Sequence, residues 1–301
     1  MHVAALVSAL VPWIDRLFPD PERAGRLRQA LEERFGDDAR EAGEAECREI
    51  ERTARAFSRH FTLKFEPAGT LVPDAEPPGW PPQDPAEVRA RAGSVEEVRR
   101  LPDGVGVLRL SGLDAVEHAA PFLEAAFALL SGARSVILDL RANGGGDPAT
   151  VALVLDWVLG GGSPRHISDV LYRDRTRQWW TPGRPAGRAL DPGVRVAVLV
   201  GQGTYSSGEA LAYHVQTRGR GPIVGEATPG AADHVTPVRV TPHVLAELPE
   251  ARVRDAVSGG NWEGTGVVPD VACAVPEALD TALATLSEPP MRRPGCWSTR
   301  R

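Results

Sequence analysis

The strongest constraint on the fold of this chain is an alternation, from about residue 104 onward, of short apolar runs with segments of helical periodicity. Each apolar run is short enough to be a single strand and is followed by a turn that contains glycine. The predicted strands are residues 106–110, 135–140, 194–200 and a run beginning at 223, and the predicted helices are 119–130, 148–159 and one beginning near 206. Repeated β-α-β units of this kind predict an α/β fold with a largely parallel sheet and helices on its faces.

The residues before this alternation follow a different pattern. Asp20 followed by Pro21 is typical of a helix start, and a second helix is predicted from about residue 38 to residue 57. Seven prolines fall within residues 67–85, a density that neither a helix nor a central strand tolerates. We therefore expect an N-terminal helical domain over 1–66, a proline-rich connection over 67–100, an α/β domain over 101–287 and a flexible tail over 288–301.

Charge and cysteine usage argue against several classes of protein. The 34 basic and 40 acidic residues give a net charge of −6, which does not provide the basic surface that nucleic-acid binding requires. The apolar run over residues 3–11 ends at Pro12, far short of the ~20 residues that cross a bilayer, and lacks the flanks of a secretory signal. Cys47, Cys273 and Cys296 are scattered and odd in number, which argues against a disulfide framework or a thiolate metal site. We expect a cytoplasmic protein with neither nucleic acid nor membrane as a partner.

Two turns at strand ends carry the candidate chemistry. The glycines of residues 143–146 leave backbone N–H groups free to hold an anion or an oxyanion, although a flexible turn explains them equally well. Ser206 stands at a strand-to-helix junction, where the positive end of the helix dipole favours a nucleophilic hydroxyl. Ser206 and Glu209 are also spaced as a capping box, which is the structural alternative.

A nucleophilic serine needs a base, and the residues alone do not select one. The seven histidines of the chain are His2, His60, His118, His166, His214, His234 and His243. The sequence contains no His-Glu-x-x-His, paired Cys-x-x-Cys or Walker loop, which argues against zinc hydrolysis and nucleoside-triphosphate chemistry.

Taken together, these motifs resemble the C-terminal-processing, or tail-specific, serine peptidases. Four segments match that family in order, namely residues 138–146, 204–209, 224–230 and 261–270. The last segment is most similar to the branch that contains interphotoreceptor-retinoid-binding-protein domains and tricorn core proteases. The resemblance implies a crotonase-like fold for the α/β domain, peptide-bond hydrolysis, and neither a cofactor nor a metal.

The resemblance also assigns roles to individual residues. It places the nucleophile at Ser206 and the oxyanion hole at the backbone N–H groups of Gly146 and Ser207. The classical branch has a lysine base at the position of Ala231. The chain has one lysine, Lys64, which lies in a different segment, so a Ser-Lys dyad is excluded.

The tricorn-like branch instead takes its base from a histidine that follows the N-terminal helices, which corresponds here to His60. Glu263 matches the glutamate that relays to this histidine, but Arg59 stands where the branch has a serine. His234 is the alternative base, with Asp233 beside it. We favour His60, because the branch provides a geometry in which it reaches the nucleophile.

The resemblance finally bears on partners. Too few residues separate Phe65 from Gly104 for a PDZ domain, so the helical domain or the cleft itself must recognise a peptide or protein substrate. Peptidases of this family often assemble, which leads us to expect a homo-oligomer formed through the α/β domain or the N-terminal helices. An inactive family member that binds a small apolar ligand or a peptide is the alternative, and a crotonase-type acyl-CoA enzyme is a third reading.

Overall fold

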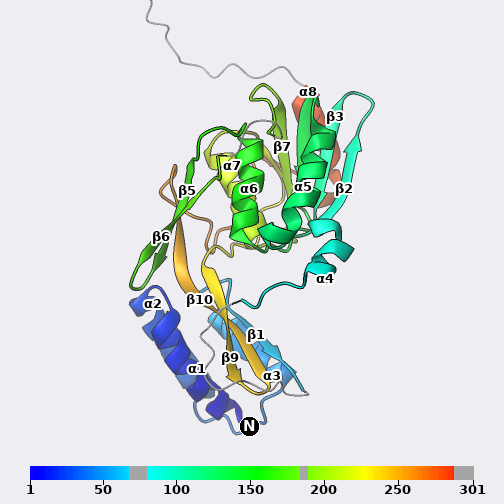
Figure 1. Cartoon of the computed structure of the whole chain (residues 1–301). Coiled ribbons are helices and arrows are strands. Elements are labelled where there is room, and N and C mark those ends of the chain that lie inside the picture. Colours follow the sequence, from blue (N-terminus) through cyan, green and yellow to red (C-terminus); the bar gives the residue numbers. More distant parts are fainter. Residues whose placement is uncertain (68–79, 184–188, 288–301) are drawn as a thin grey trace, which may run out of the picture.

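The computed structural model describes residues 1–67, 80–183 and 189–287, which form a mixed α/β architecture with two sheets (Figure 1). In spatial order, the larger sheet comprises β11 (Val271–Ala272), β8 (Ile223–Gly225), β7 (Arg195–Val200), β4 (Ser135–Asp139), β3 (Val105–Leu110) and β2 (Val95–Arg100). Neighbouring strands from β11 to β3 pair in parallel, whereas β2 pairs antiparallel with β3. The largely parallel sheet predicted from the strand-helix alternation is therefore confirmed.

Helices cover both faces of this sheet. One face packs against α5 (Val116–Leu130), α6 (Pro148–Val158) and α7 (Ser207–Thr217), and the other packs against α8 (Ala278–Ser287). Because the central strands are buried on both faces, they are apolar throughout instead of alternating, as in residues 136–138 of β4. The helices and strands predicted for residues 106–223 lie within about three residues of the observed ones.

The second sheet is antiparallel and is organised around one long strand, β10. Its strands are β1 (Thr62–Phe65), β10 (Val244–Asp255), β5 (His166–Tyr172), β6 (Thr176–Trp180) and β9 (His234–Thr241), which pairs with β10. The first residues of β10 pair with β1 and with β9, and residues 251–255 pair with β5. Strand β10 therefore runs from the N-terminal region to the edge of the α/β region.

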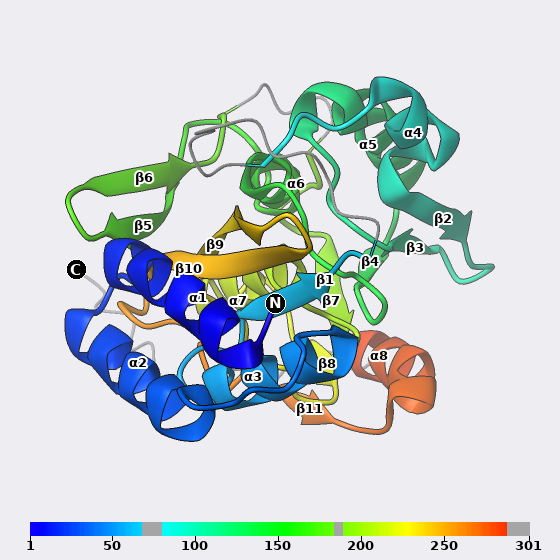
Figure 2. The same cartoon turned by 90° about the horizontal axis from the view of Figure 1, so that it is seen from below.

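The N-terminal helices α1 (Val3–Leu17), α2 (Pro21–Phe35) and α3 (Glu44–Ala54) lie across this strand (Figure 2). They share one hydrophobic core with residues of β9 and β10, including Val244 and Ala246. The predicted N-terminal helical domain is thus completed by strands from much later in the sequence. Helix α3 begins later than predicted because Gly43 caps it, donating its N–H to the Glu46 side chain at 3.2 Å.

Part of the predicted connection over 67–100 is folded. It contains the short helix α4 (Pro85–Ala90), a turn of 3₁₀ helix (Ala92–Ser94) and the edge strand β2. Strand β2 is absent from the predicted elements because its Val-Glu-Glu-Val-Arg-Arg residues are mostly charged, which suits an edge strand that is largely open to solvent. Residues 68–79 of the connection and the predicted tail over 288–301 lie outside the described residues.

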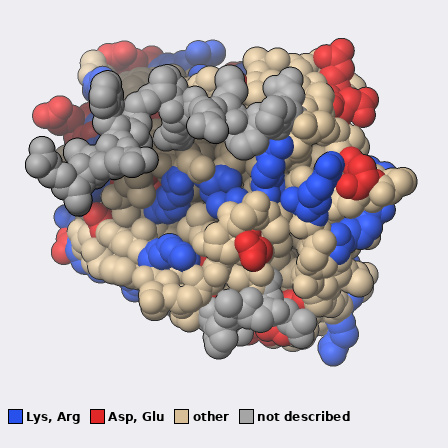
Figure 3. All heavy atoms as spheres, turned by 90° about the horizontal axis from the view of Figure 1, so that it is seen from above, with Lys and Arg blue, Asp and Glu red and all other residues tan. Residues whose placement is uncertain are grey.

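The end of the molecule that carries α8 shows basic side chains in a loose row, separated by uncharged residues and with acidic side chains nearby (Figure 3). Several arginines bond backbone carbonyl groups and so join secondary-structure elements. Arg195 donates to the Thr285 carbonyl at 2.8 Å, and Arg220 donates to the Val194 carbonyl at 2.7 Å. Within the three described ranges, none of the helices is both long enough and apolar enough to span a bilayer.

Candidate active site

A cavity of about 650 Å³ lies where the carboxyl ends of β4 and β7 face the second sheet. It is lined by five of the six residues that the sequence analysis singled out as catalytic, oxyanion-hole or alternative-base groups: His60, Gly146, Ser206, Ser207 and His234. The sixth, Glu263, does not line the cavity. The carboxyl edge of a parallel sheet is where such folds place their ligands, because the strand-to-helix turns converge there.

Ser206 occupies the sharp turn between β7 and α7. Its backbone has φ +52° and ψ −119°, a conformation that costs a residue with a Cβ on the order of 1–3 kcal/mol. The turn is held by the Ser206 N–H, which donates to Glu209 Oε2 at 2.9 Å, and by the Gly208 N–H, which donates to the Tyr205 carbonyl at 2.8 Å. A strained serine that faces a cavity is a functional candidate, whereas capping a helix does not require such a backbone.

The glycine-bearing loop after β4 packs directly against this turn. Buried Asn143 fixes the loop, since its side chain donates to the Leu110 carbonyl at 3.1 Å and accepts from the Gly145 N–H at 3.0 Å. Gly145 has φ +94°, and a Cβ there would lie 2.9 Å from the Ser206 Cβ. Only a glycine therefore permits this contact.

Two backbone donors meet beside Ser206. The Leu113 N–H donates to the Gly145 carbonyl, and the Leu113 carbonyl accepts from the Asp147 N–H. The Gly146 N–H, between these two bonds, has no acceptor among the described residues. Ser207 is the first residue of α7, so its N–H has no partner within the helix. The Ser207 hydroxyl donates to the Gly146 carbonyl at 2.7 Å and ties the two together. Such paired donors can stabilise an oxyanion.

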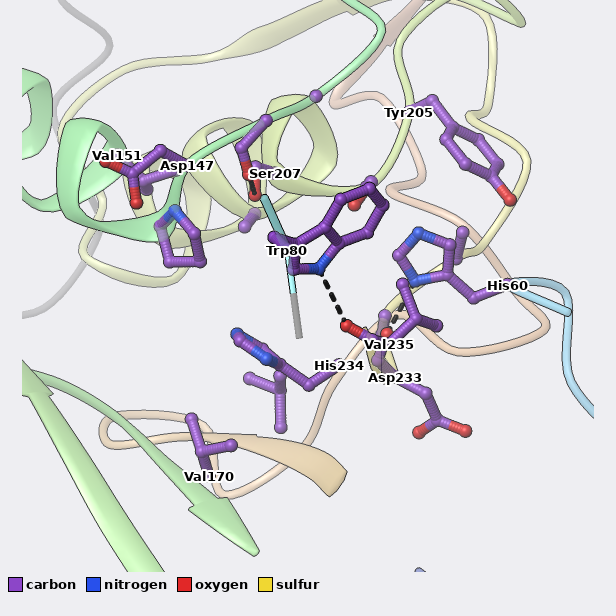
Figure 4. Close-up of a pocket in the computed structure, with 18 of the residues that line it drawn as sticks. His60, Trp80, Asp147, Val151, Val170, Tyr205, Ser207, Asp233, His234 and Val235 are labelled. Atoms are coloured by element: carbon purple, nitrogen blue, oxygen red, sulfur yellow. Dashed lines mark hydrogen bonds between the residues drawn. The ribbon is translucent and has the colours of Figure 1, made fainter. Parts of the chain in front are cut away.

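His60 lies between α3 and β1 and is 7% exposed. Its Nδ1–H donates to the Asp233 carbonyl at 2.5 Å, and its ring meets the Tyr205 ring edge-on with centroids 5.2 Å apart (Figure 4). Tyr205 directly precedes Ser206, so the imidazole lies beside the serine turn. Burial lowers the His60 pKa to about 4, with the bond to Asp233 opposing this shift. The ring is therefore neutral at pH 7, and Nε2 carries its lone pair.

His234 is the first residue of β9 and reaches the same cavity, on the side nearer to Val170 (Figure 4). Its Nδ1 lies 3.9 Å from Glu250 Oε1, and its buried Nε2 has no partner among the described residues. Both candidate bases are therefore in the cavity. Of the two, His60 makes a ring contact with the residue next to Ser206.

The hydrogen bonds of Glu263 go to groups beside the His60 ring, and its charge raises the His60 pKa. One of its carboxylate oxygens accepts from the Arg59 N–H at 2.9 Å and from the Ser58 hydroxyl at 3.3 Å. The other accepts from the N–H groups of Ala232 at 2.7 Å and Asp233 at 3.0 Å. The Nδ1 atom of the His60 ring is already bonded to the Asp233 carbonyl. Glu263 joins the segment at 58–59, before His60, to the segment at 232–233, which holds the ring.

Glu209 has a larger role than the capping one weighed from the sequence. Beyond Ser206, this fully buried carboxylate accepts from the Thr228 hydroxyl at 2.5 Å and from the N–H groups of Gly230 at 2.7 Å and Ala231 at 2.9 Å. Burial raises its pKa, and these hydrogen bonds oppose that rise. Glu209 joins the serine turn to the turn at 228–231, a tertiary contact with no local sequence signal.

Asp233 connects the N-terminal helices to the site. Its carboxylate is 1% exposed and pairs with Arg23 of α2 at 2.5 Å. Burial, followed by the charge of Glu263, raises the Asp233 pKa to about 6, and Arg23 opposes this shift. The N-terminal region thus contributes both His60 and Arg23, whose positive charge neutralises the Asp233 carboxylate next to His60.

Residues 80–83, predicted as connection, line the cavity. Trp80 donates its Nε1–H to the Val235 carbonyl at 3.1 Å (Figure 4), and Gln83 accepts from the Ala115 N–H at 2.7 Å. Within the residues that the structure describes, no group of three or more histidine, cysteine or acidic side chains is arranged to hold a metal ion.

Comparisons with known proteins bear on the family and the fold. Residues 104–273, more than half of the chain, match the sequence profile of peptidase family S41. A lipoprotein from Streptococcus agalactiae has a similar structure, with a TM-score of 0.62, 15% identity, and coverage of 95% of this chain and 96% of that one. The photosystem II D1 C-terminal processing protease has a TM-score of 0.55, 18% identity, and coverage of 95% and 96%. At these identities the similarity concerns the fold. The matched range contains Gly146, Ser206 and Glu263 but not His60.

Proposed function

The chain belongs to peptidase family S41 and is a serine peptidase, and we propose that it hydrolyses peptide bonds with Ser206 as nucleophile and His60 as general base. The observation that carries this proposal is the strained backbone of Ser206, packed against Gly145 in a cavity that also contains a buried histidine. Strain of this kind persists only where the surrounding structure imposes it, and it concentrates at functional sites.

The first step is activation of the serine. A serine hydroxyl is too weak an acid to attack an amide unaided, so a base must accept its proton as Oγ bonds to the carbonyl carbon. The bond from His60 Nδ1–H to the Asp233 carbonyl supports this role, because it fixes the tautomer in which Nε2 is the acceptor.

The second step is stabilisation of charge on the substrate. As the tetrahedral intermediate forms, the N–H groups of Gly146 and Ser207 hold the oxyanion. His60 then gives its proton to the leaving amine, and the acyl-enzyme forms. Water, deprotonated by the same imidazole, attacks the acyl carbonyl, and the proton returns to Ser206 as the acid product leaves.

Four expectations from the sequence remain predictions. A crotonase-like topology is supported by the parallel sheet, in which β4 and β7 each end in a turn at the cavity. We also propose a peptide or protein substrate and self-association. The cytoplasmic location stays a prediction.

A serine-directed fluorophosphonate tests the proposal. We expect it to label the wild-type protein at Ser206 and not at exposed Ser8, with the site read by mass spectrometry. Ser206→Ala abolishes labelling, and the control Ser8→Ala leaves it unchanged. His60→Ala slows labelling ~10²-fold, as expected for loss of a general base.

The alternative base and the alternative function are outcomes of the same experiment. His234→Ala has the smaller effect if His60 is the base. Loss of labelling in His234→Ala, with His60→Ala unimpaired, transfers the role to His234. A folded wild-type protein that is not labelled at any pH contradicts the peptidase proposal and favours an inactive family member that binds an apolar ligand or a peptide.

A further inference from the structure

The cavity continues from the serine turn along one face of α7. Ser207, Ala210 and His214 all line it, and their spacing of three and four residues places them on the same side of the helix. At 1.5 Å per residue, the rise from Ser206 to His214 is ~12 Å. The cavity therefore includes a slot that begins at the serine and ends at a histidine.

His214 is held in one tautomer at the end of this slot. It is 3% exposed, and its Nδ1–H donates to Asp255 Oδ2 at 2.9 Å. Arg218 donates to the same oxygen at 2.8 Å. Although burial opposes its ionisation, the hydrogen bonds from His214, Ser258 and Arg218 hold the Asp255 pKa well below its usual range.

This arrangement leaves one nitrogen of His214 available. Burial lowers the His214 pKa, so the ring is neutral. With Nδ1 protonated, Nε2 is a hydrogen-bond acceptor, and it has no partner in the part of the chain that the structure describes. A ligand that covers this acceptor must supply a donor, because an acceptor buried without a partner is costly.

The sides of the slot are apolar. The Trp262 ring meets the His214 ring edge-on with centroids 6.0 Å apart. Val170 and Val253 pair across β5 and β10, and both line the cavity. Ser168 lines it too and is the register partner of Asp255, which puts a hydroxyl near the histidine end.

We propose that this slot receives the side chain of the residue that supplies the scissile carbonyl, and that it selects tyrosine. The inference rests on the proposed peptidase function and names the substrate of the same site. The apolar sides accept an aromatic ring, His214 Nε2 accepts the phenol O–H, and Ser168 can donate to the phenol oxygen.

Other side chains fit less well. Phenylalanine fills the slot but leaves Nε2 without a donor. A carboxylate brings no donor, and a lysine or arginine finds no free counter-charge, because Asp255 already pairs with His214 and Arg218.

Cleavage of a matched peptide series by the wild-type protein tests this selectivity. The peptides differ only in the residue before the scissile bond, which is tyrosine, phenylalanine, O-methyltyrosine or leucine. We expect kcat/KM for tyrosine to exceed that for phenylalanine about 10-fold or more, and O-methyltyrosine, which cannot donate, to fall below phenylalanine. Equal values for tyrosine and phenylalanine overturn the inference.

A variant tests the role of the histidine. In His214→Leu, the ratio of tyrosine to phenylalanine cleavage falls to about 1, while phenylalanine cleavage persists. Circular dichroism checks folding, and the double variant His214→Leu/Asp255→Leu, which also removes the buried carboxylate, replaces the single variant if that does not fold. An unchanged ratio in a folded variant contradicts the inference.

A binding measurement separates this inference from the peptidase proposal. Acetylated peptide acids ending in tyrosine or phenylalanine are titrated into Ser206→Ala, and the change in tryptophan fluorescence is followed, since Trp80, Trp179 and Trp262 line the cavity. About 10-fold tighter binding of the tyrosine peptide supports the slot even if the wild-type protein is not labelled by fluorophosphonate. Labelled wild-type protein with equal binding of both peptides overturns the slot and leaves the peptidase proposal standing.

Discussion

His60 donates its Nδ1–H to the backbone carbonyl oxygen of Asp233 at 2.5 Å, so main chain, and no carboxylate, orients this ring. A carbonyl group fixes the tautomer as well as a carboxylate does, but it adds no negative charge to stabilise an imidazolium ion. Burial therefore dominates, and the His60 pKa falls to about 4. The side chain of Asp233 turns instead toward Arg23.

This relationship predicts an acid limb of activity at unusually low pH. If neutral His60 is the base, the rate constant for fluorophosphonate labelling stays level from pH 8 to about pH 5 and is halved near pH 4, where the ring becomes protonated. The labelling rate constant is measured across this pH range from reactions quenched at fixed times, and circular dichroism confirms that the protein stays folded.

A limb nearer pH 6 has a different source in this structure. The Asp233 pKa is raised to about 6, so its carboxylate takes up a proton as the pH falls through that value. A limb near pH 6 that disappears in Asp233→Asn identifies that carboxylate. A loss of labelling well above pH 5 that persists in Asp233→Asn contradicts His60 as the base.

Two adjacent glycines provide a matched test of the loop beside the serine. In Gly145→Ala the new methyl group meets the Ser206 Cβ at 2.9 Å, and the backbone has a φ that alanine rarely adopts. We expect a loss of about 1–3 kcal/mol in the free energy of unfolding and a loss of labelling of 10-fold or more.

Gly144 is the control, because a Cβ there has nothing within 4 Å. Gly144→Ala therefore changes stability, measured by urea unfolding, by no more than about 0.5 kcal/mol and leaves labelling near the wild-type rate. Equal effects of the two substitutions show that packing against Ser206 is not the constraint at Gly145.

Replacement of Glu209 by glutamine tests the contact between the two turns. The carboxylate accepts four donors with its two oxygens, whereas glutamine offers one oxygen and turns an NH₂ group toward the remaining donors. We expect Glu209→Gln to lower the free energy of unfolding by about 2–4 kcal/mol and to slow labelling at least 10-fold. Exposed Glu44 is the control, and Glu44→Gln has little effect on either. Full labelling in Glu209→Gln contradicts a positioning role.

The features predicted correctly from the sequence are local ones. Gly146 and the pair Ser206-Ser207 stand where a strand ends and a helix begins, and parallel strands bring such ends together at one edge. Their convergence on one cavity therefore follows from fold class alone. His60 also reaches the cavity, although the S41 match does not extend to it.

The features that were missed depend on contacts through space. The hydrogen-bond partner of the His60 ring is a backbone carbonyl, which leaves no trace in residue type, while Glu263 bonds the Arg59 N–H beside the ring. Similarly, the N-terminal helices complete their core with β10, and Trp80 reaches Val235, across separations that no local periodicity reports. These contacts bring the N-terminal region to the site.

The buried pair of Arg23 and Asp233 provides the last prediction, which concerns how the N-terminal helices support the site. Arg23→Met leaves the Asp233 carboxylate buried beside Glu263 without its counter-charge, a change that costs about 3 kcal/mol at pH 7. Because Arg23 lowers the Asp233 pKa, that pKa lies above 6 in the variant, so the cost is largest at alkaline pH and shrinks as the pH falls toward 6, where the carboxyl group of the variant is already neutral. Urea unfolding at pH 7 and pH 5 measures the difference.

Arg23→Met combined with Asp233→Asn costs less than Arg23→Met alone, and labelling of Ser206 slows most in the single variant, because the Asp233 carbonyl holds His60. Arg28→Met, which removes an exposed pair with Asp15, changes stability by no more than about 0.5 kcal/mol. A cost for Arg23→Met that matches this control, or one that grows at pH 5, contradicts the proposed coupling.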